Sequence, residues 1–160
     1  MDVFIIAFVG HRKVKDMKNL KLKINSMIES LILKDNADTF LFGSKSQFDN
    51  ICYDSVTELK IKYPYIRRIY VRAANEYVKK EYEDYLLSHY EDLIFPIVVR
   101  NAGKAAYIRR NESMIDMCDI LVAYYRTDYE PSGNKNRKSG TQLAMKYADR
   151  KGKRIINFAT

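Results

Sequence analysis

Short apolar runs alternate along the chain with longer amphipathic segments. Val3 to Val9 is a continuous apolar run that ends at Gly10, which is typical of a strand covered on both faces in a parallel sheet. From Val14 to Leu33 apolar residues recur at helical spacing, and most of the lysines fall elsewhere on the helical wheel. The pattern predicts that the first run is the central strand and that an amphipathic helix follows it.

The same alternation continues to the end of the sequence. Further strands are expected at residues 39–42, 66–71, 93–99, 120–125 and 154–158, and further helices at residues 46–60, 76–90, 105–117 and 141–150. Pro96 interrupts the strand at 93–99 and favours a peripheral place for it. Because regular alternation implies right-handed crossovers, we expect an α/β fold. It would be a three-layer, Rossmann-like, open and mainly parallel sheet with helices on both faces, in one domain over residues 1–160.

The first three predicted helices carry residues suited to the core along one face. In the first they are Met17, Leu20, Ile24, Met27, Ile28, Leu31 and Ile32. In the second they are Phe48, Ile51, Cys52, Ser55, Val56 and Leu59. In the third they are Val78, Tyr82, Tyr85 and Leu86. Tyr77, Tyr82, Tyr85 and Tyr90 also stand near helical spacing, which favours a core or subunit contact over a stacking platform for bases.

The composition narrows the class of protein. Of the 160 residues, 47% are hydrophobic, which is enough to fill a core and excludes a disordered basic tail. Cys52 and Cys118 lie in apolar stretches without disulfide or metal-ligand spacing, so we expect reduced, buried thiols in a cytoplasmic protein, and neither a metal nor a cofactor. No apolar run approaches the roughly 20 residues of a membrane helix, and the opening residues lack the basic leader and cleavage site of a signal peptide.

A formal net charge of +8 indicates an anionic partner. The lysine-rich first helix is one candidate surface for nucleic acid. Its lysines, however, are spread around a solvent-facing arc, and no nucleic-acid motif accompanies them. Nucleic acid is therefore not the expected partner, and a small anion is favoured.

Glycines fall in the loops where predicted strands lead into helices, at Gly10, Gly43, Gly133 and Gly140. In a parallel sheet these loops gather at the carboxyl edge, where ligands bind. The Gly10, His11 and Arg12 loop lacks the spaced glycines of a dinucleotide fingerprint, but it could hold an anion at a helix entrance. Gly43 and Ser44 resemble only the end of a P-loop, so nucleoside triphosphate hydrolysis is not expected.

The last strand-to-helix junction carries a sharper signal for phosphate. Ser139 is a plausible N-cap, Gly140 allows backbone to approach a ligand, and Thr141 offers an amide and a hydroxyl at the positive end of a helix. On the preceding predicted helix, Arg110 is expected to face the cleft with Asn111 beside it. The loop from 128 to 138 is a candidate lid.

Taken in order, these motifs resemble the SLOG superfamily, in particular its small single-domain bacterial branch. The motifs are Phe8-Val9-Gly10-His11-Arg12, the segment from Phe42-Gly43 to Phe48-Asp49, Tyr107 to Asn111, Met114-Ile115-Asp116, Asp119, and Ser139-Gly140-Thr141. The resemblance covers nearly the whole chain. It implies a Rossmann-like sheet that binds nucleotides or nucleotide-derived ligands.

The superfamily includes the LOG-type phosphoribohydrolases, which release a base from a nucleoside monophosphate with an Arg and a Glu. Arg110 matches that Arg, but the Glu position falls on Ala144, which cannot stabilise an oxocarbenium-like centre or move a proton. Glu112, Asp116 or Asp49 could supply a carboxylate instead. Each also has an ordinary explanation, as a solvated acidic face or as a first-turn acid that favours the helix dipole.

The main expectation is a protein that senses or sequesters a phosphate-bearing, nucleotide-derived small molecule. The residues expected to line its cleft are Gly10, His11, Arg12, Gly43, Ser44, Arg110, Asn111, Ser139, Gly140 and Thr141. One alternative is an N-glycosidase, phosphoribohydrolase or ribosyl transferase that acts on a nucleotide. Another is a non-catalytic regulatory protein with a vestigial ligand site. Since members of the superfamily associate, a homo-oligomer is also expected.

Overall fold

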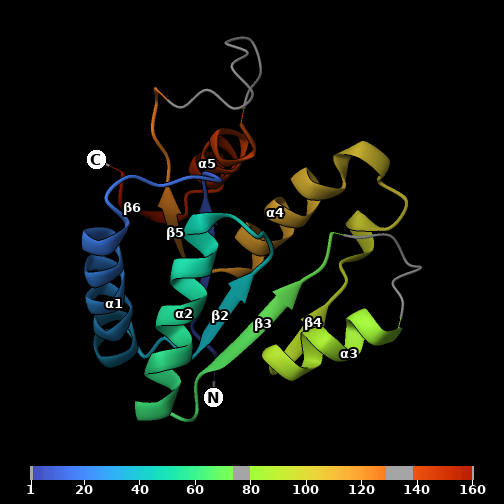
Figure 1. Ribbon diagram of the computed structural model, residues 1–160. Coiled ribbons are helices and arrows are strands. Elements are labelled where there is room, and N and C mark those ends of the chain that lie inside the picture. The colour runs from blue at the N-terminus through green and yellow to red at the C-terminus, as the bar shows by residue number, and fades with distance from the viewer. Residues whose placement is uncertain (1, 74–79, 129–138, 160) are drawn as a thin grey trace.

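Strands and helices alternate through the computed structural model, which describes residues 2–73, 80–128 and 139–159 (Figure 1). The strands are β1 (Ile5–Gly10), β2 (Thr39–Phe42), β3 (Arg67–Val71), β4 (Asp92–Ile94), β5 (Ile120–Tyr124) and β6 (Arg154–Asn157). The helices are α1 (Met17–Lys34), α2 (Gln47–Lys62), α3 (Lys80–His89), α4 (Ala106–Met117) and α5 (Gly140–Arg150), with short 3-10 turns η1 (Ile97–Val99) and η2 (Gly103–Ala105) before α4.

All pairings in the six-stranded sheet are parallel, in the order β4-β3-β2-β1-β5-β6. The predicted α/β class is confirmed, and β1 lies inside the sheet as expected. Residues of α1 and α2 pack with one face in one core cluster, and residues of α4 and α5 pack with the other face in a second. The chain order reverses between β1 and β5, so the topological switch point of the sheet lies there.

Burial confirms most of the predicted inward faces. All six residues predicted for the face of α2 are buried, and Ser46 caps this helix by accepting a hydrogen bond from the Asp49 amide. The prediction is wrong at two positions, because the side chains of Met17 and Tyr85 are 45% and 56% exposed. Met17 is the first residue of α1 and precedes Leu20, the first buried residue of that helix. Val78 lies outside the described residues.

The strand expected at 93–99 is shorter in the structure. Its paired part ends at Ile94, and after Pro96 the chain turns into η1. This difference has a simple cause, because Pro96 has no N–H group and cannot continue a ladder. The peripheral place predicted for the strand is confirmed, since β4 stands at the sheet edge.

Both cysteines are free and buried. Burial raises the pKa of the Cys118 thiol to about 11 and that of the Cys52 thiol well above its ordinary value. Both thiols therefore stay protonated at neutral pH. Within the described part of the chain, no helix has both the length and the apolar character needed to cross a bilayer.

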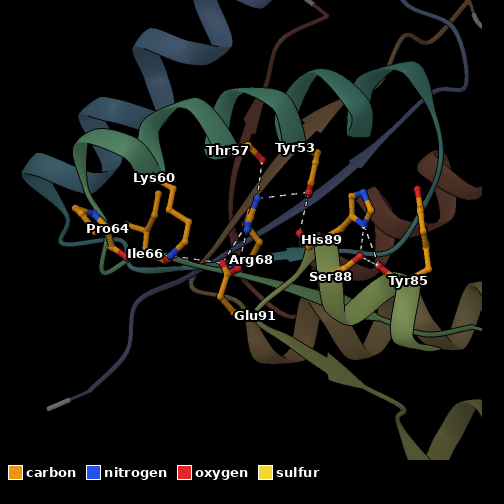
Figure 2. Close-up of polar contacts among 10 residues, drawn as sticks. All are labelled: Tyr53, Thr57, Lys60, Pro64, Ile66, Arg68, Tyr85, Ser88, His89 and Glu91. Atoms are coloured by element: carbon orange, nitrogen blue, oxygen red, sulfur yellow. Dashed lines mark hydrogen bonds and ion pairs between the residues drawn. The ribbon is translucent and has the colours of Figure 1, made fainter. Parts of the chain in front are cut away.

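A polar network fastens the start of β3 to α2 and to the residue before β4 (Figure 2). The guanidinium of Arg68 donates to both carboxylate oxygens of Glu91, at 2.7 and 3.1 Å, and to the hydroxyl of Thr57 at 3.1 Å. Lys60 donates to the carbonyl of Ile66 at 2.6 Å and lies 3.7 Å from Glu91. Burial would raise the pKa of Glu91, but the hydrogen bonds from Arg68 hold the pKa below its ordinary value.

We predict that Glu91→Gln lowers the free energy of unfolding by about 1 to 3 kcal/mol at pH 7, because it removes charge-assisted hydrogen bonds from a mostly covered Arg68. A lowered pKa in the folded state stabilises the fold above the ordinary value of 4.5. That stabilisation is lost as the pH falls through the folded pKa. The free energies of unfolding of wild type and variant, measured with urea, should therefore converge as the pH is lowered.

Asp92→Asn is the matched control. Asp92 pairs with Arg67 at 3.5 Å, but the two side chains are 54% and 47% exposed. Such a surface pair contributes about 0 to 1 kcal/mol, so the control should change stability little. Equal losses in the two variants would contradict the role given to Glu91.

Candidate functional site

The carboxyl edge of the sheet brings together the loops after β1 and β2 and the first turns of α4 and α5 (Figure 1). Because all strands are parallel, Gly10, Phe42, Val71 and Tyr124 end at this edge. Open α/β sheets bind ligands beyond these ends. The candidate site is therefore built from these loops and from the two helix starts.

Arg110 is a buried cation at this edge, with 3% of its surface exposed. Its Nη1 donates to the carbonyl of Gly43, and its Nε donates to Oδ1 of Asn111 at 2.9 Å. Burial lowers the pKa of Arg110, opposed by the charge of Asp49, but an arginine keeps its charge at neutral pH. Among residues 2–73, 80–128 and 139–159, no carboxylate oxygen lies within 4.0 Å of a guanidinium nitrogen of Arg110, so Arg110 has no ion-pair partner there.

Gly43 is a glycine because Arg110 crosses directly over it. A Cβ atom at Gly43 would lie 2.6 Å from Cδ of Arg110 and 2.9 Å from Sδ of Met114. Separations under 3 Å force one partner to move. The absence of a side chain at Gly43 therefore allows the guanidinium to reach the end of β2.

Asp49 is a buried carboxyl in the first turn of α2, with 2% of its surface exposed. Its Oδ2 accepts hydrogen bonds from the hydroxyls of Ser44 and Ser46, the latter at 3.0 Å. Its Oδ1 is buried and accepts none from the part of the chain that the structure describes. Burial raises the pKa of Asp49 to about 7, although the Ser46 hydrogen bond and the charge of Arg110 oppose the rise. The site thus pairs an orphaned carboxyl oxygen with a nearby buried cation.

Asp49→Asn should change how stability depends on pH. With a pKa raised from 3.8 to about 7, the folded Asp49 keeps its proton while the unfolded chain loses it, so wild type loses stability as the pH rises through that window. The variant lacks this loss. Its stability relative to wild type should rise by on the order of 1 to 4 kcal/mol between pH 4 and pH 7, measured by urea unfolding at each pH. A difference that stays constant with pH would contradict the raised pKa.

The start of α5 forms the second half of the site. Ser139 is confirmed as the N-cap, since its hydroxyl accepts from the Gln142 amide at 2.9 Å. Gly140 is exposed, and a Cβ atom there would meet no other atom within 4 Å. Thr141 is 7% exposed. The positive end of this helix is therefore capped by a side chain and open at Gly140.

A cavity of about 160 Å³ lies between α4 and α5. Its lining includes Asn111 and Glu112 from α4 and Gly140 and Ala144 from α5. Asn111 is also the hydrogen-bond partner of Arg110. Asn111 thus links Arg110 to the cavity that Gly140 lines at the start of α5.

The end of β1 and the loop after it, residues 10–12, pack against and hydrogen-bond to other parts of the fold. A Cβ atom at Gly10 would lie 2.6 Å from Cβ of Phe48, so Gly10 admits the start of α2. His11 is 2% exposed, and its Nε2 accepts from the amide of Arg126 at 2.8 Å. Burial lowers the pKa of His11 to about 4, so its ring is neutral at pH 7. Arg12 is exposed, and its carbonyl accepts from the amide of Gln47 at 2.9 Å.

The candidate catalytic carboxylates on α4 lie at different places. Glu112 lines the cavity and pairs with Arg109 at 2.8 Å. Asp116 accepts hydrogen bonds from the hydroxyl of Tyr147 at 2.8 and 3.0 Å, close to the end of α4 and thus toward the opposite edge of the sheet. The structure does not bring Asp116 to the candidate site.

Residues 129–138, which make up most of the predicted lid and include Gly133, lie outside the described residues.

Two tyrosines that sequence reasoning did not assign to the site, Tyr70 and Tyr107, lie near Arg110. Tyr107, in the first turn of α4, has its ring centroid 5.7 Å from the guanidinium carbon. Tyr70 is the last residue but one of β3 and is almost buried, and its pKa is raised by burial and then by the neighbouring Tyr82. The only signal for Tyr70 in the sequence is its place near the end of a predicted strand.

Within the described ranges, no three His, Cys, Asp or Glu side chains form a group that could hold a metal ion. Comparison with known families and proteins gave no assignment: no family model matches the chain, and no curated protein matches it.

Proposed function

We propose that this protein binds a phosphate-bearing, nucleotide-derived small molecule at the carboxyl edge of its sheet. One observation carries the proposal, namely that Arg110 is a buried cation with no ion-pair partner among the residues that the structure describes. A buried charge is costly unless it is paired as well as hydrogen-bonded. An anionic ligand at this edge would supply the missing ion pair.

The surroundings of Arg110 suit a nucleotide. The capped, open start of α5 offers backbone amides and the positive end of a dipole to a phosphate. The orphaned Oδ1 of Asp49 is a buried acceptor, suited to a hydroxyl or N–H group such as those of ribose or a base. The resemblance to the SLOG superfamily points to the same class of ligand.

Binding without turnover is the favoured form of this function, since the helix position that carries Glu in the LOG-type enzymes is Ala144 here. Ala144 is 3% exposed and lines the cavity. An alanine cannot transfer a proton or stabilise positive charge. We therefore favour a role in sensing or sequestering the ligand.

A thermal-shift screen tests the proposal with nucleoside mono- and diphosphates, cyclic nucleotides and dinucleotides. A ligand present at a hundred times its dissociation constant adds about 2.7 kcal/mol to the free energy of unfolding. This raises the melting temperature by several degrees in a chain of this size. Stabilisation by at least one compound is expected. Its absence across the panel would contradict the proposal.

The second candidate is cleavage of an N-glycosidic bond, and one observation favours it. Glu112 lines the same cavity as Ala144, so this cavity retains a carboxylate. Chromatography after incubation with nucleoside monophosphates would detect the free base. A rate that Glu112→Gln does not reduce would remove this candidate.

The proposal includes a cytoplasmic protein that self-associates. Ile97 and Val98 of η1, next to α4, are 82% and 57% exposed, and apolar side chains of this kind are commonly covered in subunit contacts. Sedimentation of a monomer alone at micromolar concentration would contradict this part.

A further inference from the structure

Tyr70 of β3 and Tyr107 of α4 lie beside Arg110, and Tyr82 of α3 lies next to Tyr70; we call these three residues the tyrosine wall. Their closeness is visible in their electrostatics, because the pKa of Tyr70 is raised by burial, then by Tyr82 and Tyr107, and is opposed by Arg110. A ring from β3 and a ring from α4 therefore lie beside one cation at the carboxyl edge, and a ring from α3 lies next to the first of them.

Only one ring of the tyrosine wall is both beside the cation and open. Tyr70 is 9% exposed and packs against Tyr90 at 5.2 Å between ring centroids. The ring of Tyr82 has the ammonium of Lys45 at 5.4 Å and the nearly parallel ring of Tyr85 at 6.3 Å. Tyr107, by contrast, is 68% exposed.

Tyr107 also stands at the right place along α4. It lies three residues before Arg110, which puts the two side chains on one helical face. Asn111 follows four residues after Tyr107, about 6 Å along the helix axis, and lines the cavity with Gly140. The order along this face is an open aromatic ring, a buried cation and then the start of α5.

An exposed aromatic ring beside an arginine suits the flat face of a nucleobase. Stacking of a base on an aromatic side chain is tolerant of the identity of the base, because every base has a π-face. A phosphate suits the other end of the row, where the start of α5 is open at Gly140. A sugar phosphate alone would leave Tyr107 uncovered.

We infer that the ring of Tyr107 is the stacking surface for the aromatic base of the ligand, next to Arg110. This inference rests on the proposed function and sharpens it: the ligand is a nucleotide with an intact base, held with its base at Tyr107 and its phosphate at α5.

The experiment compares the four common nucleoside monophosphates with ribose 5-phosphate by isothermal titration. Wild type should bind at least one nucleoside monophosphate more tightly than ribose 5-phosphate. Tyr107→Ala should weaken that nucleotide roughly 5- to 150-fold and leave ribose 5-phosphate within about twofold of wild type. Tyr107→Phe, which keeps the ring, should bind like wild type.

Tyr65→Ala is the control for removing an exposed tyrosine. Tyr65 is 61% exposed and lies between α2 and β3, at the opposite edge of the sheet. It should leave all affinities unchanged. Since both side chains are mostly exposed, neither variant is expected to unfold.

The outcomes separate the two proposals. If ribose 5-phosphate binds wild type as tightly as every nucleotide, or if Tyr107→Ala binds the nucleotide like wild type, the stacking role is overturned and the phosphate site stands. If no nucleotide and no ribose 5-phosphate binds wild type, the proposed function is contradicted and the stacking role falls with it.

Discussion

Gly10→Ala should lower the free energy of unfolding by about 1 to 3 kcal/mol or more, the usual cost of overpacking a core. The new Cβ would lie 2.5 Å from Cγ and 2.6 Å from Cβ of Phe48 and would also meet Cδ2. Phe48 is fully buried, and its Cβ is tied to the backbone of α2, so rotation of the ring cannot relieve the overlap. The helix and the end of β1 must separate instead. Urea unfolding measures the loss.

Gly140→Ala is the control for this prediction. A Cβ atom at Gly140 would meet nothing within 4 Å, and alanine is a better helix former than glycine. This variant should be as stable as wild type or slightly more stable. A Gly10→Ala protein that unfolds at the wild-type midpoint would show that α2 does not pack on the end of β1 as described.

Arg110→Met should weaken binding of the nucleotide that stabilises the protein by roughly 10- to 150-fold. This is the effect of losing hydrogen bonds to a charged group, about 1.5 to 3 kcal/mol. Methionine fills much of the same space, and replacing a buried charge by an apolar side chain is often tolerated by the fold. The affinity should therefore fall much more than the stability, as measured by isothermal titration and urea unfolding.

Arg109→Met is the matched control, because it removes the same charge one position away. Arg109 is 54% exposed and pairs with Glu112 on the surface of α4. It should alter both affinity and stability little. Equal losses of affinity in the two variants would point to a general effect of positive charge and would contradict a specific role for Arg110.

The fold was predictable because its signals are local. The apolar run of β1 and the helical spacing of α2 can each be recognised from residues close together in the sequence. The strand from Thr39 to Phe42 has the predicted bounds. Even the early end of β4 follows from one residue, Pro96. Local propensity and pattern agree with the tertiary structure at these places.

The details of the site were less predictable because they depend on contacts between distant positions. The sequence places Gly10 and His11 in a ligand loop, whereas the structure gives Gly10 a packing role against Phe48 and ties His11 to the Arg126 amide. The approach of Tyr70 to Arg110 joins segments that are far apart along the chain. No pattern within one element indicates such a meeting.

Native mass spectrometry of the protein with an equimolar mixture of nucleoside monophosphates is the most direct test of nucleotide binding at Arg110. We expect a one-to-one adduct with the mass of a nucleotide in wild type and in Arg109→Met, and its loss in Arg110→Met. The absence of any adduct in wild type, or an adduct of equal abundance in Arg110→Met, would contradict it.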